Sequence, residues 1–371
     1  MNGTRWWSVH VVYYAEDRHA LLLDAVEPWW ERIRPHVTAA YWIPHWRRGP
    51  HLRLDVETDA TTFADVVTPA VDEIVRPFLA EHPSRAAVDP GRLLAAHRRL
   101  ADLEREDGPL TPLRPDNSVH LGVHDRRLAV LGSDAAADLL AEFRSASTRT
   151  AFDAVRATPR RAQLVALAYD LTVATAHALS GVGLARGFVS FRSHADAFLS
   201  WWPEADGFRA AWDRHYRSHA ARLLARTAAV TEAIDHAPGT MPLVGDWVDL
   251  LGPFWDRGGE LLDAGQLSLD PPWAGVDLGD PAILDLLRRS PFHGSRLTTR
   301  RPVNAAWFAR YRLMLNYTYL HLTRLGLTPV ERFLLCHLAA GAAEELYGVV
   351  APDVAFPAPE ETAAPAGRRP P

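Results

Sequence analysis

Lysine is absent from the 371-residue chain, and all 40 of its basic residues are arginine. Without lysine, the protein can form no lysine Schiff base of the kind that pyridoxal enzymes use, and it has no lysine for a Walker phosphate-binding loop. Cysteine is almost absent as well. Cys336 lies alone in the apolar run FLLCHLAA, which excludes an internal disulfide and any cysteine-pair zinc or redox motif. We expect this thiol to be buried and inert.

Long apolar runs and an excess of positive charge are also missing. No uninterrupted apolar stretch approaches the roughly 20 residues that span a bilayer, and the start MNGTRWWSVH has no apolar signal region. A net charge of -5 gives no electrostatic footprint for nucleic acid or anionic lipid. With 48% apolar and 23% charged residues, the composition predicts a soluble, cytoplasmic, globular protein without a nucleic-acid or membrane partner.

The first 81 residues contain patterns of both strands and helices. Residues 6–15, 39–46 and 51–57 are rich in aromatic and branched side chains, and RRGP makes a turn between the last two segments. Residues 18–33 and 62–81 repeat apolar side chains at helical spacing. We therefore predict that residues 1–81 form an α+β unit in which helices pack on one face of a small mixed sheet.

The rest of the chain is mainly helical. Residues 82–117 are rich in proline and charge and are expected to be a connector, and residues 118–124 are consistent with another strand. Helical patterns follow at 133–145, 147–156, 160–180, 204–234, 242–252 and, as a pair, between 303 and 347. Thr328, Pro329 and Glu331 predict a capping box at the start of the last helix. Residues 118–349 are thus expected to form a helical body of the same domain, and 350–371 a disordered Pro/Ala-rich tail.

The densest polar and aromatic cluster is YWIPHWRRGPHLRLD, residues 41–55. Strand alternation places His51, Arg53 and Asp55 on one face of the second strand, so that a cation lies beside a carboxylate. This pattern is typical of a solvated sheet face with a rim of ion pairs. The nearby aromatic side chains, Trp46 among them, favour instead a groove that binds a peptide.

A second cluster, RYRLMLNYTYLHLTRLG, covers residues 310–326. Tyr317 and His321 are four residues apart and share a helix face, whereas Tyr311 is only partly on the same side. Tyrosines in a core helix often only pack, with one hydroxyl hydrogen bond each. Alternatively, a buried phenol here donates a proton to a developing oxyanion or imine.

A shorter polar motif occurs in FRSHADAFL, residues 191–199, where Arg192, Ser193 and His194 precede an apolar run. We expect Ser193 to cap the helix that follows, or to contact substrate together with its neighbours. No HExxH motif occurs, and no metal site is expected. A GxSxG nucleophile elbow and a complete dinucleotide-binding fingerprint are also absent.

Three stretches, in order, resemble the C-terminal domain of lantibiotic dehydratases and the stand-alone thiopeptide-type biosynthesis proteins related to it. They are WWSVHVVYY with the strand pair AAYWIPHWRRGPHLRLDVE, then GFVSFRSHADAFL, then NYTYLHLTRLGLTPVERFLLCHLAAGAAEE. The resemblance spans about residues 5–348 and implies an α+β fold with no metal or organic cofactor. It also implies a precursor peptide, made of a leader and a dehydrated core, as the main partner, with other enzymes of the same pathway as further partners.

The resemblance implies one of two chemistries. One branch eliminates glutamate from glutamylated Ser or Thr, as a subunit of a split dehydratase would. The other joins two dehydroalanines by a formal four-plus-two cycloaddition and then loses water and the leader peptide to form a pyridine. Eliminating domains carry two arginines in the strand that contains Arg53, but here the second position is Asp55, which would repel the leaving carboxylate. The sequence therefore favours the pyridine synthase branch, with elimination and non-catalytic peptide binding as alternatives.

In the pyridine-forming branch, the predicted active groove lies between residues 41–55 and 311–321. Tyr311 or Tyr317 would be the proton donor, Arg53 would polarise a backbone carbonyl, and Asp55 or His45 would shuttle a proton during dehydration. The peptide-binding side chains expected around them are Trp46, His51, Arg192, Ser193, His194 and His321.

Overall fold

The computed structural model describes residues 3–201, 205–269, 281–299 and 305–355. Within it the chain forms two compact units, residues 1–159 and 160–371. Each unit is described separately below. No single described helix is long and apolar enough to cross a membrane; helices 161–179 and 184–200 meet the length and composition criteria only as a pair bent by 105°.

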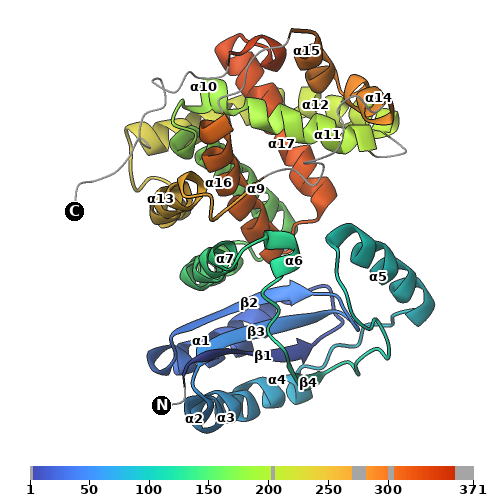
Figure 1. Cartoon of the computed structure of the whole chain (residues 1–371), viewed down its shortest axis with the longest axis vertical. Helices are drawn as coiled ribbons and strands as arrows, with labels where there is room; N and C mark the ends of the chain where they lie inside the picture. The colour runs from blue at the N-terminus through green and yellow to red at the C-terminus, as the bar shows by residue number, and fades with distance from the viewer. Residues whose placement is uncertain (1–2, 202–204, 270–280, 300–304, 356–371) are drawn as a thin grey trace. The chain divides into compact units, whose positions relative to one another are not determined.

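The first unit is built on a four-stranded antiparallel sheet in the order β2-β3-β1-β4 (Figure 1). The strands are β1 (Arg5–Val12), β2 (Ala39–His45), β3 (His51–Thr58) and β4 (Ser118–Gly122). The helical segments are η1 (Leu21–Val26), α1 (Glu27–Ile33), η2 (Arg34–His36), α2 (Ala60–Thr62), η3 (Phe63–Val67), α3 (Thr68–Ala70), η4 (Val71–Val75), α4 (Arg76–Glu81), α5 (Pro90–Glu104), α6 (Leu128–Leu131), α7 (Asp134–Ala146) and α8 (Thr148–Ala157). The predicted α+β class is confirmed, but the sheet, which was predicted to be mixed, pairs all four strands antiparallel.

One face of this sheet is apolar and is covered by helices. The alternation of β3 places Leu52, Leu54 and Val56 on this face, all at most 1% exposed. The Trp7 ring of β1 stacks on Phe63 of η3 at a centroid distance of 4.3 Å. Helices α1 and α8 complete the cover through Trp30 and Phe152, whose rings lie 5.7 Å apart. Burial of these large side chains stabilises the unit, since each contributes roughly 1.5–3 kcal/mol.

Residues 82–117, expected to be a connector, contain the 15-residue helix α5. Asp89 caps this helix by accepting hydrogen bonds from the backbone N–H groups of Gly91 and Arg92, and Pro90 occupies its first position. The cap and the proline are present in the sequence, but the high charge of the segment hid the helix. After α5, the chain returns to the sheet as β4, so the polar segment connects two parts of the same unit.

The second unit is entirely helical in the described part of the chain. Its elements are α9 (Arg161–Leu179), α10 (Leu184–Gly187), α11 (Val189–Trp201), α12 (Ala205–Asp235), α13 (Pro242–Asp263), α14 (Pro281–Arg289), α15 (Pro291–Thr299), α16 (Ala305–Arg324), α17 (Pro329–Tyr347) and η5 (Ala351–Asp353). Helix α9 packs against α12, α13 and α16, and α17 packs against α11 and α12 (Figure 1). The capping box predicted at Thr328 and Glu331 is confirmed.

A buried hydroxyl joins three helices in the centre of this unit. The Thr175 Oγ1 of α9 lies 2.9 Å from the Thr318 Oγ1 of α16 and accepts a hydrogen bond of 3.1 Å from the Trp247 indole of α13. Such a junction satisfies polar atoms that burial would otherwise penalise. It also fixes the register of the helix that carries the predicted tyrosine cluster. Of the predicted tail, residues 351–353 form the short helix η5, and residues 356–371 lie outside the described residues.

Candidate functional site

The opposite face of the sheet carries the polar residues of the first cluster. His51, Arg53 and Asp55 of β3 are 1%, 4% and 2% exposed, so the interpretation of a solvated face is wrong. In the antiparallel register, Arg53 pairs with His10 and Asp55 pairs with Ser8, both on β1. Glu106 of the loop after α5 contacts His45 at 3.3 Å, and Arg144 of α7 lies over the Tyr41 ring at 5.7 Å, so both segments contribute side chains to this face. We call this set of inward-facing residues the polar sheet face.

Stacked rings form a ladder along the polar sheet face. The His10 and His51 rings stack with centroids 4.7 Å apart, and the His45 ring follows at 5.3 Å from His51. Trp46 then stacks on His45 at 5.5 Å. Burial, the largest cause, lowers the pKa of His10 to about 3, of His51 to about 2 and of His45 to about 4. The three imidazoles are therefore neutral near pH 7.

Hydrogen bonds set the tautomer of two of these imidazoles. The Nδ1 of His45 accepts from the backbone N–H of Arg47 at 3.1 Å, so its Nε2 carries the proton and donates to Glu106 at 3.3 Å. The Nδ1 of His51 donates to the carbonyl of Gly49 at 2.8 Å, and its buried Nε2 accepts no hydrogen bond from the residues that the structure describes. The two hydrogen bonds of His45 hold its ring in one orientation and one tautomer.

The carboxylate of Glu106 is ionised although it is buried. Burial alone would raise its pKa, but the hydrogen bond with His45 and the charges of Arg127 and Arg53 together lower it to about 2. Arg127 lies 2.9 Å from Glu106 Oε1, and Arg47 lies 3.2 Å from Oε2. Glu106 comes from the loop after α5 and was not predicted from the sequence, because it lies some 60 residues from the strand it contacts.

Arg53 and Asp55 occupy the centre of the polar sheet face. The buried Nε of Arg53 has no hydrogen-bond partner in the described part of the chain, and burial lowers the pKa of this guanidinium. Burial would raise the pKa of Asp55, but His124, Ser8 and Arg53 hold it below its usual range. His124 Nδ1 lies 3.3 Å from Asp55 Oδ1. The site therefore combines a buried cation that lacks a partner at Nε with an ionised carboxylate.

The polar sheet face also contains residues that the first cluster did not include. Ser8 and His10 alternate along WWSVHVV and could have been assigned to one face, but the strand appeared to be apolar on both sides. Arg114 donates to His10 Nδ1, and His124 stacks on the Trp6 ring at 4.7 Å. Only the three-dimensional register brings these residues to Arg53.

In the second unit, the three adjacent residues of the FRSHADAFL motif point to three different neighbours. Ser193 lies inside helix α11, which begins at Val189, so the prediction that it caps the helix is wrong. Its Oγ lies 3.0 Å from His293 Nε2, and His293 Nδ1 lies 2.6 Å from Ser290 Oγ. His194 Nδ1 lies 2.9 Å from the Tyr319 hydroxyl. No sequence pattern signals His293, which lies 100 residues from its partner.

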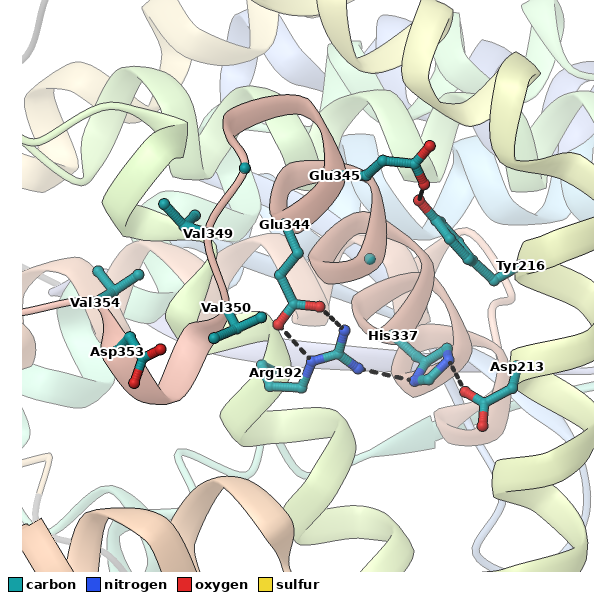
Figure 2. Close-up of a pocket in the computed structure, with 12 residues that line it drawn as sticks. Arg192, Asp213, Tyr216, His337, Glu344, Glu345, Val349, Val350, Asp353 and Val354 are labelled. Carbon is teal, nitrogen blue, oxygen red and sulfur yellow. Dashed lines mark hydrogen bonds and ion pairs between the residues drawn. The ribbon is translucent and has the colours of Figure 1, made fainter.

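Arg192 lines a pocket of about 640 Å³ between α11, α12, α17 and the segment that follows α17. Figure 2 shows its guanidinium between Glu344 and His337. It donates to Glu344 from Nε at 3.3 Å and from Nη2 at 2.5 Å, and to His337 Nδ1 at 3.1 Å. Among the predicted binding residues, Arg192 borders this pocket.

The predicted tyrosine cluster on α16 is buried within its own unit. Tyr311 is 1% exposed, and its hydroxyl donates to the carbonyl of Gly187 at 2.9 Å. Burial raises the pKa of this phenol well above its ordinary value, so it stays protonated. Tyr317 lies edge-on to Phe254 at 6.2 Å. Burial lowers the pKa of His321 to about 3, and this ring packs on Trp247 at 4.5 Å.

The structure thus gathers Arg53, Asp55, His45, Trp46 and His51 on one sheet face of the first unit. It places the other predicted residues on α11 and α16 of the second unit. The groove expected between residues 41–55 and 311–321 would require both units, and it stays a prediction.

Comparison with known proteins gives three findings. Residues 6–343 match the family model described as lantibiotic biosynthesis dehydratase C-term. A solved structure titled pyridine synthase TbtD, from thiomuracin biosynthesis, is 37% identical with a TM-score of 0.77, and the match covers 93% of this chain and 99% of that one. A crystal structure of TsrL, at 20% identity and TM-score 0.64 over 95% and 97% of the two chains, shares the fold. No curated protein matches the chain.

Proposed function

Since the chain belongs to the family of lantibiotic biosynthesis dehydratase C-terminal domains, we infer that it is a pyridine synthase of thiopeptide maturation. The observation that carries this inference is the 37% identity to the thiomuracin pyridine synthase, which extends over 93% of this chain and 99% of that one. A match of this extent includes residues of both units. The substrate of this reaction is a precursor peptide that carries two dehydroalanines.

The composition of β3 supports pyridine formation over glutamate elimination. An eliminating enzyme must hold the leaving glutamate carboxylate, for which a pair of arginines is suited. Here Asp55 takes the second position and is held ionised by its neighbours. Its negative charge beside Arg53 would oppose a second carboxylate at this place.

The reaction requires few catalytic groups from the protein. Two alkenes and one amide in its iminol form close the six-membered ring, and the loss of water and of the leader peptide then makes the ring aromatic. No oxidant, metal or organic cofactor is required. Holding the alkenes in reactive geometry can account for roughly 7–11 kcal/mol of the barrier, so binding residues matter as much as acids and bases.

We assign the proton transfers to the side chains that the sequence suggested. Tyr311 or Tyr317 donates to the reacting amide, and Arg53 polarises a backbone carbonyl. Asp55 or His45 moves the proton that leaves with water, and hydrogen bonds at both ring nitrogens keep His45 in a fixed orientation. Peptide-binding roles are proposed for Trp46, His51, Arg192, Ser193, His194 and His321. A cytoplasmic location and further partners among the enzymes of the same pathway complete the proposal.

Mass spectrometry of a dehydrated precursor peptide incubated with the protein tests the function. We expect loss of water from the core together with release of the leader peptide. Loss of glutamate mass from a glutamylated precursor would instead identify an eliminase. A precursor that binds and keeps its mass would indicate a peptide-binding protein without this activity, and either of these results would refute the proposed reaction.

A further inference from the structure

The pocket beside Arg192 has a polar floor that is held in place by an ordered chain of contacts. Glu344 binds Arg192, Arg192 donates to His337 Nδ1, and His337 Nε2 lies 3.0 Å from Asp213 Oδ1 (Figure 2). Burial is the largest cause of the lowering of the pKa of His337 to about 4. The neutral imidazole accepts from Arg192 on one side and donates to Asp213 on the other, so every contact has a donor and an acceptor.

Formal charge at this floor is negative after the internal pairs are counted. Arg192 and Glu344 neutralise each other, and His337 is neutral. Asp213 therefore has a neutral imidazole as its contact, and Glu345 accepts a hydrogen bond of 2.7 Å from the neutral Tyr216 phenol. Arg209, which also influences His337, forms its ion pair with Asp196 at 2.9 Å. Asp213 and Glu345, which border the pocket, thus form no ion pair with an arginine among the described residues.

The opposite wall of the pocket carries three valines and one carboxylate, that of Asp353. Val349, Val350 and Val354 line it, and the backbone N–H of Ala351 donates to Glu344 at 3.2 Å, which fixes the segment after α17. Gly341 allows the close packing of α12 on α17, because a Cβ there would lie 2.9 Å from the Tyr216 ring. The cavity of about 640 Å³ thus presents carboxylates on one side and the valines, with Asp353 beside them, on the other.

We propose that this pocket binds an arginine or lysine side chain of the precursor peptide, a role that rests on the proposed function. The aliphatic stem of such a residue would lie along the valine wall, and its charged end would reach Asp213 and Glu345. A small inorganic cation fits less well, since no three potential metal ligands converge in the described part of the chain. Arg192 acts here as a positioning residue that orders Glu344 and His337.

The test uses the full-length protein and two small probes of equal shape. N-acetyl-arginine amide carries the charge, and N-acetyl-citrulline amide replaces it with a neutral urea. We expect the arginine probe to bind at least tenfold more tightly and to compete with the precursor peptide. Asp213→Asn and Glu345→Gln, which keep side-chain shape, should each weaken binding of the arginine probe by about tenfold and raise KM for the precursor more than they lower kcat.

Glu232→Gln is the matched control, because Glu232 is exposed on α12 outside the pocket. It should leave binding of both probes and the precursor KM unchanged. Equal binding of the two probes would overturn the proposal, as would pocket variants that bind the arginine probe like the unmodified protein. Probe binding is measured without turnover, so its result is independent of whether the protein forms a pyridine. Mass spectrometry tests pyridine formation separately.

Discussion

At the scale of single residues, the proposed mechanism depends most on Arg53 and Asp55, which carry opposite charges. Both side chains are at most 4% exposed, and they lie on the same face of β3. A buried carboxylate is tolerated only where neighbours favour its charge, and His124 at 3.3 Å meets that need. The sequence showed that these residues share a face, but it could not show that the face is buried.

Replacing Asp55 tests whether this carboxylate takes part in the chemistry. We expect Asp55→Asn, which keeps the shape, to lower the rate of product formation by about 10²–10³ while precursor affinity changes little. Asp55→Arg should abolish pyridine formation. Its folding is checked by circular dichroism, because a second arginine would have to be accommodated beside Arg53. Full pyridine-forming activity in a folded Asp55→Arg protein would remove both the proposed role and the main argument against elimination.

The two phenols of α16 can be distinguished by removing one hydroxyl at a time. The structure gives Tyr311 a hydrogen bond to the carbonyl of Gly187, so Tyr311→Phe should also lower stability by roughly 1–3 kcal/mol. Whichever phenol donates the proton should show a fall in rate of about 10²–10³ with nearly unchanged leader affinity when replaced by Phe. Tyr347→Phe, at an exposed position near the end of α17, is the control. If Tyr311→Phe and Tyr317→Phe both retain full turnover, the phenols have no catalytic role.

At the scale of elements, a helix or strand could be predicted where the sequence pattern that identifies it lies within a few residues. The four strands and the capping box of α17 follow from patterns within a few residues, and the structure contains them. The start of α11 and the helix α5 were missed, because tertiary packing and a polar surface obscured their periodicity. The ring ladder of the polar sheet face was beyond prediction, because it depends on strand register and on Glu106 from a distant loop.

The capping box of α17 should contribute measurably to stability. The Thr328 hydroxyl accepts from the backbone N–H of Glu331 at 3.3 Å, and the Glu331 carboxylate accepts from the backbone N–H of Thr328 at 2.9 Å. Thr328→Ala removes one half of this exchange and should lower the free energy of unfolding by about 1 kcal/mol. Thr328→Ser keeps the hydroxyl and serves as the control in a denaturant titration. Equal midpoints for the two variants would contradict a role for the cap.

The ring ladder makes stability depend on pH in one direction. His10, His45 and His51 have pKa values lowered by burial to about 3, 4 and 2, whereas in the unfolded chain they titrate near 6.5. Below about pH 6.5 the unfolded state takes up protons that the folded state does not. Each histidine therefore removes up to about 1.4 kcal/mol of stability per pH unit as the pH falls towards its folded pKa.

Urea unfolding between pH 8 and pH 5 measures this slope. His51→Asn keeps a donor for the carbonyl of Gly49 but cannot titrate, so its stability should fall less steeply with acid than that of the unmodified protein. His36→Asn, at an exposed position of η2 outside the ladder, is the matched control. Parallel slopes for the unmodified protein and His51→Asn would contradict burial of a neutral imidazole.

At the scale of the whole molecule, the catalytic hypothesis distributes its residues over two units. Composition and periodicity predicted an α+β protein with a helical body, and that class is what the chain adopts. The boundary at residues 159 and 160 leaves α7 and α8 with the sheet, because their side chains contact β2. Contacts of this kind join segments about 100 residues apart, such as Ser145 and Ala40, and no local pattern signals them.

The reactivity of the single thiol of the chain reports how often the second unit opens. Cys336 is fully buried beside the Tyr319 hydroxyl, and burial raises its pKa to about 11. At pH 8 only about one thiol in a thousand would be ionised, and none of these would meet a disulfide reagent while α17 stays packed. The rate at which Ellman's reagent consumes the thiol therefore counts the openings of this unit, and a ligand that stabilises the α11–α17 pocket should slow the reaction in proportion to its occupancy.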